Sequence, residues 1–147
     1  MKWREMALAF LREAHSDLHV AEILLSEKEF ARSVEHSQHA VEKAIKAALF
    51  LKNISVTNEH FVAEVFGKNF KEHPGVSEIV TKAQALENEG TLSEYPTWDP
   101  DTDSIVSPYD EYDSETAQNF YKDAHWIFHQ IAVFLKHTYQ ISLPEDG

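Results

Sequence analysis

Apolar residues recur every three or four positions over long stretches of the chain, a spacing typical of amphipathic helices. The pattern predicts helices over residues 2–25, 29–52, 58–70, 76–88 and 114–139. Only a short polar break separates the first two, so they should pack against each other as an antiparallel hairpin. We therefore expect an all-α fold, an antiparallel up-and-down bundle of four to five helices.

Turn and capping residues set the predicted ends of the shorter helices. Thr57 or Asn58 can cap the helix over 58–70, and His73-Pro74-Gly75 ends it. Gly90 is expected to end the helix over 76–88. The second helix is rich in small residues, which favours close approach of a neighbouring helix. These residues are Ala31, Ser37, Ala40, Ala44, Ala47 and Ala48.

Residues 91–112 lack a helical pattern and are interrupted by three prolines. Aromatic residues lie among the acidic ones here, namely Tyr95, Trp98, Tyr109 and Tyr112. We interpret the segment as a loop packed through its aromatics, with docking of a basic partner as the alternative. We see no second domain, so residues 1–147 are expected to form one domain that carries this acidic loop.

The aspartates at 99, 101 and 103 have the spacing of a calcium-binding loop. Such loops need a glycine at the sixth position and a glutamate at the twelfth, where this chain has Ser104 and Asp110. A solvated acidic loop is therefore the preferred interpretation, with weak calcium binding as the alternative.

Composition narrows the function classes. The absence of cysteine excludes disulfides, thiolate zinc sites and cysteine nucleophiles. A net charge of −12 argues against non-specific nucleic-acid binding, which needs a basic surface. Arg12 and Glu13 interrupt the apolar residues near the N-terminus, and no apolar run is long enough for a membrane span. We therefore expect a cytoplasmic protein that is not inserted in a membrane.

The second predicted helix carries a recognisable motif. Residues 30–47, FARSVEHSQHAVEKAIKA, resemble the HEPN domain family (higher eukaryote and prokaryote nucleotide-binding). That family has an aromatic residue and a histidine before Gln-Gln-Ala and Glu-Lys-Ala-hydrophobic-Lys-Ala. The first helix, His60 after Thr57, and Tyr95-Pro96 also look like elements of this family.

Two positions depart from the family pattern. His39 stands where the family has its second glutamine, and Glu94 stands where an arginine usually precedes Tyr-Pro. Glu94 in place of arginine removes a positive charge from the side where the resemblance places the ligand. The resemblance implies a helical bundle that is commonly a homodimer and has roles linked to small nucleotides or RNA. It also implies a separate minimal nucleotidyltransferase as partner, and we expect no cofactor.

One face of the second helix gives a candidate nucleotide site, at or beside a dimer interface. Lysine and glutamine side chains there can hold a phosphate and a base edge. The alternative is an exposed structural face on which Glu42 and Lys46 form an i,i+4 ion pair. The predicted ligand-binding residues are His36, Gln38, His39, Glu42 and Lys46.

Some branches of the family are metal-independent ribonucleases with an Arg-x(4–6)-His motif on a late helix. The last predicted helix has no arginine, so we predict no catalytic residues and favour a binding protein over an enzyme. Arg32 and His39 do have the required spacing, in the second helix. The alternative is therefore a metal-independent endoribonuclease of toxin–antitoxin type, in which Arg32 holds the phosphate and His39 is the acid or base. A third hypothesis is a non-enzymatic interaction module that uses the acidic loop.

Three histidine pairs have a spacing that can bind zinc or nickel. No cysteine is available, and no carboxylate at a fixed spacing completes such a site, so we predict no metal site. The pairs are His15 with His19, His36 with His39, and His125 with His129.

Overall fold

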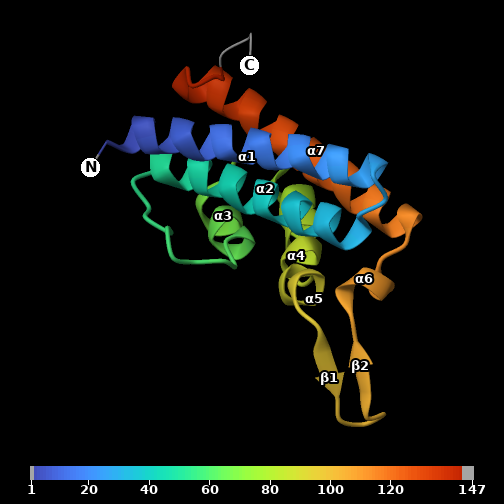
Figure 1. Ribbon diagram of the computed structural model, residues 1–147. Coiled ribbons are helices and arrows are strands. Elements are labelled where there is room, and N and C mark those ends of the chain that lie inside the picture. Colours follow the sequence, from blue (N-terminus) through green and yellow to red (C-terminus); the bar gives the residue numbers. More distant parts are fainter. Residues whose placement is uncertain (1, 144–147) are drawn as a thin grey trace.

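The computed structural model describes residues 2–143 and confirms the predicted all-α bundle, to which a small hairpin is added (Figure 1). The helices are α1 (Trp3–Ser26), α2 (Phe30–Leu51), α3 (Ala63–Asn69), α4 (Val76–Glu87), α5 (Gly90–Glu94), α6 (Pro108–Glu111) and α7 (Ser114–Tyr139). The strands are β1 (Thr97–Asp99) and β2 (Ser104–Val106). None of the helices in this part of the chain is long and apolar enough to cross a membrane.

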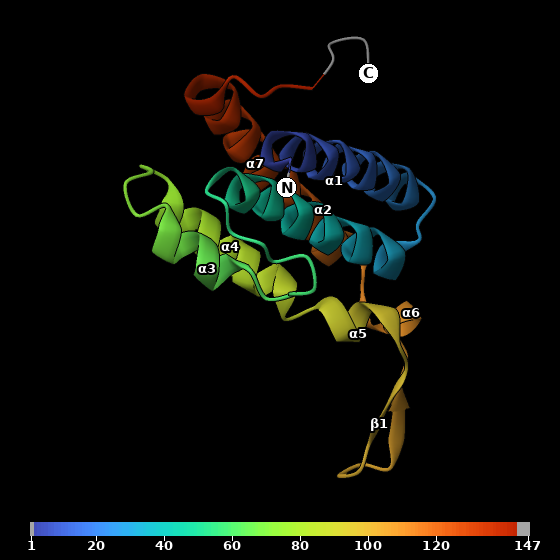
Figure 2. The same cartoon turned by 90° about the vertical axis from the view of Figure 1, so that its left-hand side faces the viewer.

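Helix α2 lies at the centre of the bundle and contacts each of the other described helices. It runs beside α1, and α7 packs against both (Figure 1). The α3–α4 pair covers the side of α2 that faces away from α1 (Figure 2). The predicted hairpin of the first two helices is present, and their small residues are buried, including Ala14, Ala21, Ala40 and Ala44.

Several polar side chains between α1 and α2 are paired, whereas the buried hydroxyl of Ser37 has no hydrogen-bond partner among the described residues. The hydroxyl of Ser33 is fully buried and donates to the carbonyl of Ala21 at 2.8 Å. Asp17 of α1 lies 3.0 Å from His36 and accepts from Lys43 at 2.6 Å. Because buried polar groups are costly unless they are hydrogen-bonded, these pairs help to set how the two helices face each other.

Helix α3 begins at Ala63, later than the sequence predicted, and neither Thr57 nor Asn58 caps it. Its first turn is capped from α4, where Glu87 Oε1 accepts from the amides of Val62 at 3.1 Å and Ala63 at 2.7 Å. Burial raises the pKa of Glu87 above its usual range, while these two amides act against that rise. The cap comes from a residue far along the chain, so local sequence could not reveal it.

Helix α7 has the predicted bounds, Ser114 to Tyr139. Asp113 caps it by accepting from the amide of Thr116 at 2.8 Å, and this hydrogen bond lowers the pKa of Asp113. At its other end the carbonyl of Tyr139 accepts from Arg4 at 2.8 Å. The end of α7 is thereby joined to the start of α1.

The segment expected to be a loop contains regular structure. Gly90 begins α5 instead of ending α4, and β1 and β2 form an antiparallel hairpin that projects from the bundle (Figures 1 and 2). Of the four aromatics expected to anchor the loop, Tyr112 is buried, and its hydroxyl donates to Glu89 at 2.5 Å. Burial raises the pKa of Tyr112. Tyr95, Trp98 and Tyr109 are exposed instead.

Candidate functional site

A cavity of about 360 Å³ opens beside the middle of α2. Its walls come from α2, from the segment between α2 and α3, and from the α4–α5 region. The lining residues are Gln38, His39, Glu42, Lys43, His60, Phe61, Glu87, Gly90, Thr91 and Glu94. A volume of this size lies at the lower end of the range for small-ligand sites.

The structure brings three of the five predicted ligand-binding residues to this cavity: Gln38, His39 and Glu42. His36 faces α1, where its Nδ1 lies 3.0 Å from Oδ1 of Asp17. Lys46 is only 3% exposed and is not a lining residue. The polar side of α2 is therefore divided between the cavity, the α1 contact and the bundle interior.

The carboxylate of Glu42 is the centre of a polar network. Its Oε2 lies 3.1 Å from Nζ of Lys46, and the same ammonium donates to the carbonyl of Thr57 at 3.1 Å. Its Oε1 lies 3.4 Å from Nε2 of Gln38 and 3.3 Å from Nδ1 of His60. The Glu42–Lys46 pair considered for an exposed face thus exists but is largely buried, and Lys46 holds both Glu42 and the turn after α2, at Thr57.

The two residues of the ribonuclease alternative lie on the side of α2 that faces α5. Nε2 of His39 lies 3.2 Å from Oε1 of Glu94. The guanidinium of Arg32 lies 2.6 Å from Oε2 of Glu35 and also donates to the carbonyl of Ser93. Both side chains are therefore already engaged with oxygen acceptors on α2 and α5.

The charges around the cavity do not favour a bare phosphate. Glu42, Glu87 and Glu94 are lining residues, and the lysine among them, Lys43, has its ammonium 2.6 Å from Asp17. Glu94 lies at the position where the resemblance led us to expect an arginine. Such a surface suits a ligand that donates hydrogen bonds, such as the hydroxyls and amino groups of a nucleoside.

Sequence reasoning missed most of the wall opposite α2. Phe61, Glu87 and Thr91 carried no motif signal, because their place depends on how α3, α4 and α5 pack. His60 was marked by the family resemblance, and it does reach Glu42. Glu94 was noted as a change of charge, and it does face His39.

Comparison with known proteins agrees with this architecture. The family model described as the HEPN domain matches residues 7–133, which include α2 and all of the cavity lining. A protein of Methanocaldococcus jannaschii named as a candidate toxin is 34% identical over 142 residues, which cover 90% of each chain. No solved structure matches the chain significantly. The chain belongs to the HEPN domain family.

Proposed function

We propose that this protein is the HEPN component of a toxin–antitoxin-type system and that it binds a nucleotide in the cavity beside α2. The observation that carries the proposal is the cavity itself, which combines hydrogen-bonding groups from the family motif with an exposed aromatic ring. The name of the Methanocaldococcus jannaschii relative supports the toxin–antitoxin setting.

The lining residues suit the base and the ribose of a nucleotide. The amide of Gln38 can both donate to and accept from a base edge. Phe61 is 67% exposed and lines the cavity, so its ring is available for stacking on a base. The carboxylate of Glu94 can accept from ribose hydroxyls. In this arrangement the phosphates point towards solvent, away from the acidic wall.

Isothermal titration tests the proposal with the four common ribonucleoside triphosphates and the corresponding nucleosides. We expect the protein to bind the triphosphate of one of the four bases, and the corresponding nucleoside should retain most of that affinity. Phe61→Ala should weaken binding by about tenfold, the effect of losing one stacking contact. Tyr109→Ala, which removes an exposed ring outside the lining, is the matched control and should bind normally.

Two results would contradict this proposal. One is the absence of heat with every ligand at millimolar concentration. The other is an affinity that Phe61→Ala and Gln38→Ala both leave unchanged, since that would place the ligand elsewhere.

The ribonuclease alternative is tested by incubating the protein with mixed RNA in EDTA. Arg32 is already paired with Glu35, and His39 lies within hydrogen-bonding distance of Glu94. Neither side chain is free to contact RNA, so we expect the RNA to stay intact. Cleavage that disappears in both Arg32→Ala and His39→Ala would replace the binding proposal with an enzymatic one.

The projecting hairpin is the surface we propose for a protein partner. Trp98 and Ile105 are paired across its strands and are 60% and 69% exposed. No lysine or arginine occurs between Gln84 and Tyr121, so the partner should present a basic face around an apolar contact. A minimal nucleotidyltransferase is the partner class that the family implies. If such a protein encoded beside this one binds the Trp98→Ser/Ile105→Ser variant as tightly as the parent protein, the assignment is wrong.

We also infer that the chain forms a homodimer, as members of its family commonly do. Sedimentation velocity should give about twice the mass of one 16.9 kDa chain, and a stable monomer at micromolar concentration would overturn the inference.

A further inference from the structure

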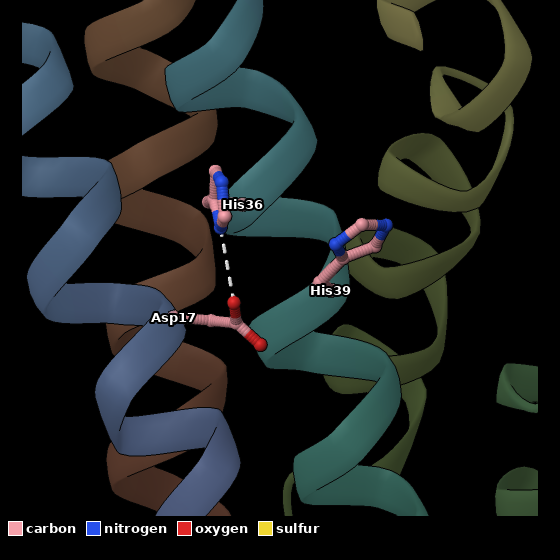
Figure 3. Close-up of side chains that lie close together, drawn as sticks. All are labelled: Asp17, His36 and His39. Carbon is pink, nitrogen blue, oxygen red and sulfur yellow. Dashed lines mark hydrogen bonds and ion pairs between the residues drawn. The ribbon is translucent and has the colours of Figure 1, made fainter.

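His39 lies between two carboxylate groups, Asp17 of α1 and Glu94 of α5. On one side it lies with Asp17 of α1 and His36, and the potential ligand atoms of these three residues are all within 4.8 Å of one another. Figure 3 shows one ring nitrogen of His39 turned towards Asp17 and His36. On the other side its Nε2 lies 3.2 Å from Glu94, near Glu35.

The first of these clusters has the composition of a transition-metal site. Two imidazoles and one carboxylate suit zinc, cobalt(II) and nickel better than magnesium or calcium, which prefer oxygen ligands. Oδ1 of Asp17 is 3.0 Å from Nδ1 of His36, close to the roughly 3.3 Å between adjacent ligand atoms around tetrahedral zinc. The side chains of His36 and His39 are about one-third exposed, at 32% and 31%. Rotation of these imidazoles can therefore close the remaining distance.

We propose that Asp17, His36 and His39 form a binding site for a divalent transition metal, with zinc as the best match. The carboxylate would bind through Oδ1, while Oδ2 keeps its 2.6 Å hydrogen bond from Lys43. Three protein ligands leave at least one coordination position for water or another small ligand. Sequence spacing could not find this site, because its carboxylate comes from a different helix.

The second cluster is a weaker competitor. Glu35 is neutralised by Arg32 at 2.6 Å, and the cluster has a single imidazole. Lys43 is the main opponent of the proposed site, since its ammonium both competes for Asp17 and repels a cation. Removing the Lys43 charge should therefore tighten metal binding, a result that a merely structural Asp17–Lys43 pair would not produce.

The test is titration of the tag-free, EDTA-treated protein with Zn²⁺, followed by calorimetry, and with Co²⁺, followed by its visible absorption. We expect each chain to bind one metal ion strongly. The visible absorption spectrum of the Co²⁺ form should be typical of four- or five-coordinate cobalt. His36→Ala and Asp17→Asn should each weaken this binding by at least about tenfold. Lys43→Met should strengthen it. His129→Ala, which changes an exposed histidine outside both clusters, should leave it unchanged.

Circular dichroism of each variant separates loss of the site from loss of the fold. Since His36 is not a cavity residue and the titration contains no nucleotide, this test succeeds or fails independently of the proposed function. The site is wrong if Zn²⁺ binding is absent at millimolar concentration, or if a folded His36→Ala variant binds as tightly as the parent. Loss of binding in Glu94→Gln alone would move the metal to the α5 side of His39.

Discussion

Replacing Lys46 with methionine is expected to lower the free energy of unfolding by about 3–5 kcal/mol. The side chain of Lys46 is 4% exposed and that of Glu42 is 11% exposed, so the change leaves a largely buried carboxylate at the cavity wall without its cation. The carbonyl of Thr57 also loses its donor. Urea denaturation followed by circular dichroism measures the effect.

The chain contains a matched control for this prediction. Glu64 and Lys68 form the same i,i+4 pair at 3.2 Å, but their side chains are 72% and 70% exposed. Lys68→Met should therefore cost less than about 1 kcal/mol, because water solvates the remaining carboxylate. In the double variant Glu42→Leu/Lys46→Met, most of the lost stability should return, since no buried charge remains. If Lys46→Met and Lys68→Met lower the free energy of unfolding equally, the buried Glu42–Lys46 pair stabilises the fold no more than an exposed pair does.

Replacing Phe50 with alanine should cost about 3–5 kcal/mol, the usual loss for a buried phenylalanine. Phe50 is fully buried near the end of α2, with its ring centroid 5.2 Å from that of Phe10 and 5.6 Å from that of Trp3. Truncating Phe50 to alanine opens a cavity where α1 and α2 pack against each other. The same urea experiment should show a lower midpoint with little change in slope.

Phe61 is the matched control for this core residue. It is 67% exposed, so Phe61→Ala should change stability by no more than about 0.5 kcal/mol. The two variants thus separate the roles of the two rings: Phe50 supports the fold, and Phe61 is proposed to contact the ligand. A loss of several kcal/mol in Phe61→Ala would mean that the loop before α3 is packed more firmly than its exposure indicates.

Three of the ten residues that line the cavity were predicted from the sequence as ligand-binding residues. Gln38, His39 and Glu42 follow one another on α2 at helical spacing, so a prediction of that helix places them near one another. The same reasoning placed Lys46 on this face, but its side chain is buried and does not line the cavity. Periodicity defines one face of a helix but does not say whether another segment covers that face. In this structure the segment around Thr57 covers Lys46.

What the sequence determined by itself are the elements governed by local periodicity. Helices α1, α2, α4 and α7 lie within one or two residues of their predicted bounds, because each carries an apolar stripe long enough to override end effects. The tertiary structure alone decided the start of α3, which depends on a cap from Glu87. It also decided which polar residues of α2 face the cavity, which of them contact Asp17 of α1, and which are buried in the interior. Those outcomes depend on contacts between segments far apart in the chain, and a pattern read along one helix contains no information about its neighbours.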